Sequence, residues 1–164
     1  MPGVLVFPGG RVDRGDHAAR PALTAETRRL LQISSSPSLA GALAACAARE
    51  LHEETGLTLT RFDALHYLTR AITPADRPIR FHARFLVAEA QHASGTIRGS
   101  GELEEVGFFA LEGLGRQPLA RITTMIVEEF QAWLAAPDSR PLYRILGRDN
   151  RRPERSPRQL PSRP

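Results

Sequence analysis

The sequence predicts an α+β fold in an αβα arrangement, and three stretches carry this prediction. Residues 80–89 alternate apolar and polar side chains with a period of two, which is typical of a strand. Residues 39–54 are rich in alanine, with Gly41 as the one helix breaker, and this favours a helix. In 119–135 apolar side chains recur on one face, which indicates a helix packed on a core.

The remaining elements follow from turn and cap signals between these stretches. Thr24 is suited to cap the N-terminus of a short helix, and Gly56 is suited to end the helix at 39–54 in the left-handed conformation. β-branched and aromatic residues bounded by turn formers indicate further strands. The elements predicted in this way are a short helix at 23–33 and strands at 4–7, 64–72 and 105–110.

At 164 residues the chain is long enough for one domain with a single core. No apolar run approaches the roughly 20 residues of a membrane span, and the N-terminus lacks the basic and apolar segments of a signal peptide. Cys46 is the single cysteine, which excludes an intrachain disulfide and indicates a reducing compartment. We therefore expect a cytoplasmic protein.

The net charge of +4 comes from the C-terminal tail. Residues 147–164 hold six arginines and two acidic residues, which leaves 16 basic and 16 acidic residues in the rest of the chain. This tail is rich in arginine, proline and serine, so we expect it to be disordered. A nucleic-acid-associated protein acting through the tail is one alternative function, but the balanced charge of the body does not favour it.

Three glutamates, Glu50, Glu53 and Glu54, crowd the last turn of the helix predicted at 39–54. On a helical wheel they fall within one arc of about 100°, and they continue the apolar stripe of the same helix. Like charges repel at this spacing, and the C-terminal end of a helix disfavours anions. Arg49 can pair with Glu53 at i,i+4 but compensates only one charge.

A divalent cation would remove this electrostatic conflict. Mg²⁺ and Mn²⁺ prefer oxygen ligands and keep some of their waters, so three glutamates are a suitable donor set. The alternative is a solvated acidic helix end with a surface Arg–Glu pair. A bare ExxEE string does not decide between the two, so the wider sequence context is needed.

Residues 49–57 read RELHEETGL and match the second half of the Nudix box, R-E-U-x-E-E-x-G-U with U aliphatic, at every position. Residues 10–16 read GRVDRGD and resemble the first half, G-x5-E, with Asp16 in place of glutamate. The chain therefore resembles a Nudix hydrolase over roughly residues 2–146, which implies an αβα sandwich with a mixed sheet. Residues 7–10 read FPGG and resemble the turn that leads into the Nudix box. The family has one or two strands before this turn, so the resemblance implies that N-terminal strands are missing and that the natural protein is longer.

Between Asp16 and Arg49 lie 32 residues, about 25 more than in the family. A subset of Nudix proteins carries an insertion inside the box, and the sequence resembles that subset, which includes a coenzyme A diphosphatase. We therefore expect a Nudix domain at 1–146 that contains an insertion at 17–38. This insertion either forms a cap that selects the substrate or is a tolerated surface addition.

The resemblance implies a pyrophosphohydrolase acting on acid anhydrides, which cleaves the pyrophosphate bond of a nucleoside diphosphate linked to another moiety. In that reaction class Arg49 orients a glutamate, and Asp16 supports the site from behind the metal ligands. The groups that would hold Mg²⁺ or Mn²⁺ are the carboxylates of Glu50, Glu53 and Glu54 and the main-chain carbonyl of Gly9.

The general base differs among Nudix members, and Glu53 is the first candidate within the box. His82 and Arg84 lie on the polar face of the strand at 80–89 and are candidate contacts for phosphate or ribose, although a partly exposed sheet face explains them as well. A solvated acidic loop is the simpler explanation of the three further candidate bases, Glu102, Glu104 and Glu105.

The expected partner is a small nucleotide-derived substrate, with no membrane and no nucleic acid, and a homodimer is left open. A second alternative function is an inactive or weak Nudix-fold ligand-binding module. It follows from the missing strand and from Asp16, whose side chain is one methylene shorter than that of glutamate.

Overall fold

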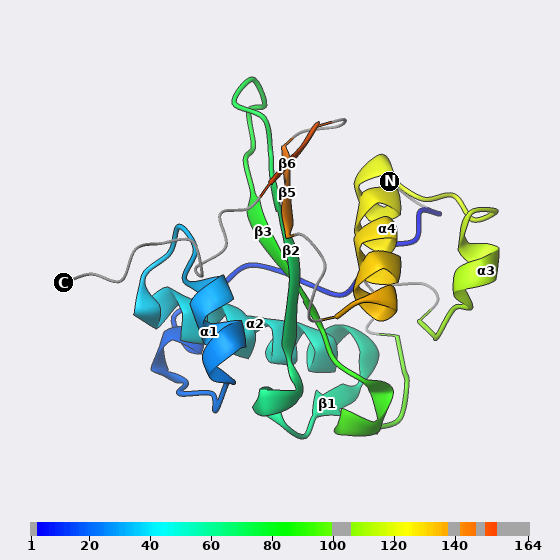
Figure 1. Cartoon of the computed structure of the whole chain (residues 1–164). Helices are drawn as coiled ribbons and strands as arrows, with labels where there is room; N and C mark the ends of the chain where they lie inside the picture. The colour runs from blue at the N-terminus through cyan, green and yellow to red at the C-terminus, as the bar shows by residue number, and fades with distance from the viewer. Residues whose placement is uncertain (1–2, 100–105, 138–141, 147–149, 154–164) are drawn as a thin grey trace.

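The computed structural model describes residues 3–99, 106–137, 142–146 and 150–153 (Figure 1). Within these ranges the helices are α1 (Ala25–Leu31), α2 (Pro37–Thr55), α3 (Leu111–Leu114) and α4 (Arg121–Ala135). The strands are β1 (Leu57–Leu59), β2 (His66–Ile72), β3 (His82–Val87), β4 (Ala93–Gly95), β5 (Tyr143–Leu146) and β6 (Asn150–Pro153). None of the helices in these ranges is long and apolar enough to cross a membrane.

A mixed four-stranded sheet with the order β3-β2-β5-β6 forms the centre of the fold. β2 pairs antiparallel with β3 on one side and parallel with β5 on the other. β6 is antiparallel to β5 and ends the sheet. β1 and β4 form a separate two-stranded ribbon next to the end of α2 (Figure 1).

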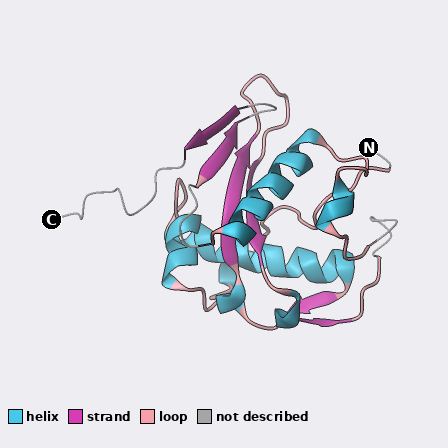
Figure 2. Cartoon of the chain, turned by 45° about the vertical axis from the view of Figure 1, so that its right-hand side comes forward, coloured by secondary structure: helices cyan, strands magenta, loops and turns pink. Residues whose placement is uncertain are grey.

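Helices pack on both faces of this sheet, and Figure 2 shows α4 beside the strands on one of them. Leu86 of β3 packs into the cluster formed with α1 and α2, whereas its neighbours Phe85 and Val87 pack against α4. Alternate side chains of a strand point to opposite faces, so these contacts place the two helical layers on opposite sides. The predicted α+β class is confirmed.

Helices α1 and α2 each begin at a residue whose side chain caps the first turn, and α2 ends at a glycine. Ser36 accepts the Leu39 amide at 3.2 Å, Pro37 occupies the first turn, and Gly56 ends α2 with φ of 75°. Thr24 caps α1 by accepting the Thr27 amide at 3.1 Å, as predicted. The alanines that made the helix at 39–54 recognisable also let α2 approach its neighbours closely, because Ala40, Ala42 and Ala44 are fully buried.

The segment predicted as an insertion at 17–38 is part of the core. Leu31 of α1 is fully buried, and Leu23 belongs to the same hydrophobic cluster. Thr27 Oγ1 donates to the carbonyl of Leu65 at 2.7 Å, immediately before β2. These contacts exclude the alternative of a tolerated surface addition, while a role in substrate selection stays a prediction.

Two predicted strands are wrong. Among the described residues, 4–7 form a single bridge, between Leu5 and Leu119, and Val6 and Phe7 remain 49% and 45% exposed. Residues 106–110 are irregular, and Phe108 is 74% exposed. Both stretches have strand-like side chains, but no strand in the described part of the chain offers them a ladder of hydrogen bonds. Residue 105 lies outside the described residues.

The predicted disorder of the tail at 147–164 is wrong for residues 150–153, which form β6. The physical reason is that β5 offers an open edge, and pairing with an edge uses backbone groups rather than apolar side chains. β5 itself was not predicted, and neither were the three-residue strands β1 and β4. Residues 147–149 and 154–164 lie outside the described part of the chain.

Candidate metal and active site

Arg49 lies at the centre of a cluster of charged side chains near the end of α2. Its Nη1 donates to Glu50 Oε1 and to Glu53 Oε2, both at 2.8 Å, so the predicted i,i+4 pair is present. Its Nε and Nη2 donate to the two oxygens of Asp16 at 3.2 and 3.1 Å. Nη2 also donates to the carbonyl of Arg11 at 2.9 Å. These bonds, first the one to Asp16, raise the pKa of the Arg49 guanidinium.

Asp16 is the buried carboxylate that ties the N-terminal loop to α2, with only 5% of the residue exposed. A tight turn positions it, because its Oδ2 accepts the Asp13 amide at 2.9 Å and its own amide donates to Asp13 Oδ1 at 3.1 Å. Burial alone would raise the pKa of Asp16, but the hydrogen bonds from Arg49 and from the Asp13 backbone outweigh burial and lower it. Asp16 therefore stays ionised and reaches Arg49.

The three glutamates differ in exposure and in partners. The side chain of Glu50 is 12% exposed and that of Glu53 is 53% exposed. Glu54 Oε2 accepts the amide of Gly9 at 2.9 Å. A Cβ built on Gly10 would overlap the Glu50 carboxylate, so the missing side chain at this position makes room for that carboxylate. The turn at Gly9 and Gly10 thus lies directly against the acidic end of α2.

The chemistry of this donor set fits a hard divalent cation. Carboxylate and carbonyl oxygens are the ligands that Mg²⁺ and Mn²⁺ prefer. Across the described residues, no three His, Cys, Asp or Glu side chains converge as the ligands of one ion. The hydrogen bonds explain the arrangement, because Arg49 and the Gly9 amide hold the carboxylate oxygens. A cation would compete with these donors for the same oxygens.

The other predicted site residues lie on β3 or outside the described residues. On β3, Arg70 Nη1 lies 3.1 Å from His82 Nε2, and Arg84 Nη2 lies 3.5 Å from the carbonyl of Ile33. Cys46, which was not predicted as a site residue, is buried one turn before Arg49, and Arg49 Nη2 lies 3.5 Å from its Sγ. Burial raises the pKa of the Cys46 thiol to about 11, which fits a core residue. The candidate bases Glu102, Glu104 and Glu105 lie outside the described residues.

Three features of the cluster were not predicted from the sequence. The structure adds the side chain of Asp13, 3.6 Å from the Arg49 guanidinium, and the carbonyl of Arg11. It also adds the contact of Gly10 with Glu50. The DRGD spacing at 13–16 is a signal for a tight aspartate turn, and it could have indicated the first of these features.

Comparison with known proteins agrees with the fold and the cluster. Residues 40–130 match the NUDIX domain family, over more than half of the chain and including Arg49 and the three glutamates. The structure is similar to that of a NUDIX hydrolase from Alicyclobacillus acidocaldarius, with a TM-score of 0.59 and 22% identity over 84% of this chain and 79% of that chain. At this identity the structural likeness shows a shared fold. A search of curated proteins found no match. The chain therefore belongs to the NUDIX domain family.

Proposed function

We propose that this protein is a metal-dependent hydrolase that cleaves the pyrophosphate bond of a nucleoside diphosphate linked to another moiety. The observation that carries the proposal is the gathering of three glutamates around Arg49 and the turn at Gly9 and Gly10. Membership of the NUDIX family supports the hydrolase class. A small nucleotide-derived molecule is the proposed substrate.

Glu50, Glu53, Glu54 and the main-chain carbonyl of Gly9 are the proposed ligands of Mg²⁺ or Mn²⁺. Such an ion, when bound, screens the charge of the pyrophosphate oxygens and lowers the pKa of a bound water. Arg49 holds the carboxylates of Glu50 and Glu53 in place, and Asp16 in turn fixes the position of Arg49.

Glu53 is the proposed general base. Its side chain is 53% exposed against 12% for Glu50, so it is the better placed of the two to meet an attacking water. Glu53 accepts the proton of that water while the new oxygen–phosphorus bond forms and the bridging phosphorus–oxygen bond breaks. The 2.8 Å bond from Arg49 Nη1 orients the Glu53 carboxylate through its Oε2.

We further propose a substrate of the kind that coenzyme A diphosphatase-like members cleave, which the insertion between Asp16 and Arg49 supports. The cytoplasmic location and a homodimer stay predictions.

Phosphate release from a panel of nucleoside diphosphate derivatives tests the proposal. The assay couples hydrolysis to alkaline phosphatase and is run with Mg²⁺, with Mn²⁺ and with neither. We expect turnover of at least one member of the panel, dependent on the metal and abolished by Glu53→Gln and by Glu54→Gln. Glu112→Gln, an exposed glutamate on α3, is the matched control and should keep full activity.

Two results would contradict the proposal. Full activity of both glutamine variants would remove the glutamates from the metal site. Absence of turnover across the whole panel, by folded wild-type protein with both metals, would show that the chain is not a hydrolase of this class.

A further inference from the structure

A row of arginines crosses the central sheet. Arg70 of β2 is paired in register with Arg84 of β3 and with Arg144 of β5, and Arg144 is paired with Arg152 of β6. Residues paired across neighbouring strands share a face of the sheet. With strands about 4.8 Å apart, the row Arg84, Arg70, Arg144, Arg152 extends over roughly 14 Å on one face.

The inner part of this row is packed beneath the end of the α1 segment. Arg70 is 2% exposed, and its Nη1 lies 3.4 Å from the carbonyl of Ile33. Arg84 Nη2 lies 3.5 Å from the same carbonyl. Arg144 is half-buried, and among the described residues nothing accepts a hydrogen bond from its buried Nε. Arg152 is exposed at the outer end of the row.

The neighbouring His82 does not add to the positive charge of the row. Its pKa is lowered to about 4, first by partial removal from water and then by the charges of Arg84 and Arg70. Arg70 Nη1 lies 3.1 Å from His82 Nε2 and can only donate, so the neutral imidazole accepts at Nε2 and carries its proton on Nδ1. The row is therefore a set of guanidinium groups beside a neutral acceptor.

Arg144 and Arg152 stand side by side at the outer end of this row, where their two guanidinium groups concentrate positive potential. Guanidinium groups bind phosphate through paired hydrogen bonds, so a phosphate-bearing anion is a suitable ligand for this end of the row. Arg152 is exposed and Arg144 is half-buried, so both residues are open to such a ligand.

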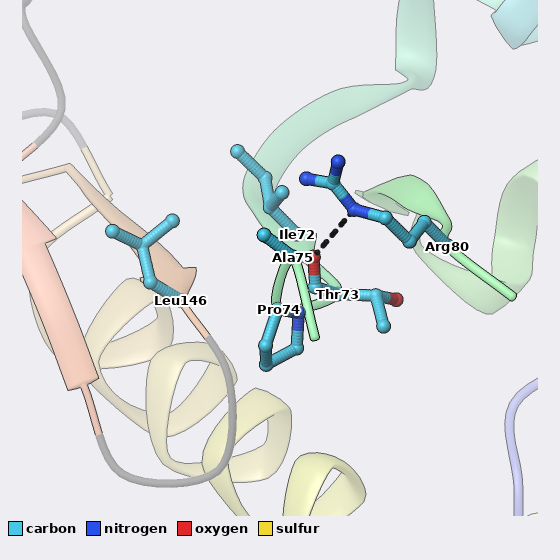
Figure 3. Close-up of a pocket in the computed structure, with 6 residues that line it drawn as sticks. All are labelled: Ile72, Thr73, Pro74, Ala75, Arg80 and Leu146. Atoms are coloured by element: carbon cyan, nitrogen blue, oxygen red, sulfur yellow. Dashed lines mark hydrogen bonds between the residues drawn. The ribbon is translucent and has the colours of Figure 1, made fainter. Parts of the chain in front are cut away.

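A pocket of about 260 Å³ adjoins the row. Ile72 and Leu146 line it, and they follow Arg70 and Arg144 by two residues in the same strands, which places them on the same face. Figure 3 shows the Arg80 guanidinium beside Ile72, with Arg80 Nε 3.4 Å from the carbonyl of Thr73. The volume is just below the range of small-molecule pockets, about 300 Å³ and above, and suits one ring-sized group.

We propose that the arginine row and this pocket form a second ligand site, for a small phosphate ester whose phosphates lie on Arg144 and Arg152 and whose apolar group enters the pocket. A small ligand is favoured over a nucleic acid because Arg70 is buried and Arg84 and Arg144 are half-buried. A nucleic-acid backbone needs an exposed basic surface instead. The site does not depend on the metal cluster or on hydrolysis.

Binding measured by calorimetry on the full chain in EDTA tests this site, with inorganic tripolyphosphate and adenosine triphosphate as probes. We expect both to bind, with affinities that fall as salt is raised. Arg144→Gln should weaken both by about tenfold or more, since it removes charge-assisted hydrogen bonds, and Arg152→Gln should weaken them less. Leu146→Asn should weaken adenosine triphosphate while leaving tripolyphosphate unchanged. Arg116→Gln, an exposed arginine outside the row, is the matched control and should change neither.

Several results would overturn the proposal. Absence of binding by both probes would do so, and so would equal losses in Arg116→Gln and Arg152→Gln. Tighter binding of a single-stranded oligonucleotide, lost in the same arginine variants, would replace the small ligand by a nucleic acid. Because Arg152 is exposed, its variant folds even if Arg144→Gln does not, and it decides the outcome alone. Since the probes are not hydrolysed in EDTA, loss of this site is distinguishable from loss of hydrolase activity.

Discussion

Replacing Gly10 by alanine is expected to disable the active site without unfolding the protein. A Cβ on residue 10 would overlap the carboxylate of Glu50, whereas a Cβ on Gly9 would meet nothing within 4 Å. Both substitutions add the same methyl group to the same turn. They therefore form a matched pair that differs only in what the methyl group meets.

The size of the effect follows from the geometry. Ordinary contact for the new Cβ begins at about 3.4 Å, so the Glu50 carboxylate has to move by roughly 1 Å or more. A displacement of this size in a catalytic group costs on the order of 100-fold in rate. Stability should change by less than about 1 kcal/mol, because a flexible carboxylate can move and because alanine reduces the entropy of the unfolded chain.

The assay is metal-dependent turnover of the best substrate of the panel, together with the urea unfolding free energy of both variants. We expect Gly10→Ala to lose about two orders of magnitude in kcat/KM and Gly9→Ala to stay within about twofold of wild type. Wild-type turnover by Gly10→Ala, or equal losses in the two variants, would refute the placement of Glu50 in the site.

Three further predictions follow from the contacts of single residues. Asp16→Asn removes the buried charged partner of Arg49 and should lower the unfolding free energy by about 1–3 kcal/mol. The Asp13 side chain is 57% exposed and 3.6 Å from Arg49, so Asp13→Asn should lower the unfolding free energy by less than about 1 kcal/mol. Equal losses of unfolding free energy in urea titrations of the two variants would contradict the role of Asp16. The imidazole of His82 should show no titration in NMR spectra until the pH falls well below 6, because its pKa in the folded protein is about 4. Since this pKa is below the unfolded value of 6.5, the contribution of His82 to stability is complete above pH 6.5 and is lost as the pH falls toward 4. An NMR titration midpoint near 6.5 would contradict this prediction. Gly56→Ala should destabilise by more than about 1 kcal/mol, because φ is 75° and a Cβ would meet the carbonyl of Thr96, and Gly115→Ala, with open space around it, should not.

Helices α1, α2 and α4 could be predicted because their signals are local, whereas the four-residue α3 was not predicted. Thr24 and Gly56 directly flank the helices that they cap, and the alanine-rich stretch shows α2 within two residues at its N-terminus and one at its C-terminus. The stretches at 4–7 and 106–110 failed for the opposite reason. A strand requires a partner strand, and the side chains of Val6 and Phe108 carry no information about whether one is adjacent.

In the candidate site, the contacts within one helix could be predicted from the sequence, and the contacts between distant segments could not. The spacing of Glu50, Glu53 and Glu54 on one helix predicts their common face, and the structure shows the pair of Arg49 with Glu53. The bonds of Arg49 to Asp16 join residues 33 positions apart, and they depend on how the α1 segment folds back onto α2. Pairing registers such as Arg70 with Arg144 are likewise set by the assembled sheet, so the arginine row could not be read from the sequence.

The central claim is that the three glutamates at the end of α2 form a site for a divalent metal. Mn²⁺ titration, with free Mn²⁺ followed by electron paramagnetic resonance, tests it most directly because it needs no substrate. Wild-type protein should bind at least one Mn²⁺ ion saturably, and Glu50→Gln and Glu54→Gln should each weaken binding by about tenfold or more, while Glu112→Gln leaves it unchanged. Equal Mn²⁺ affinity in the wild type and in all three variants would contradict the claim.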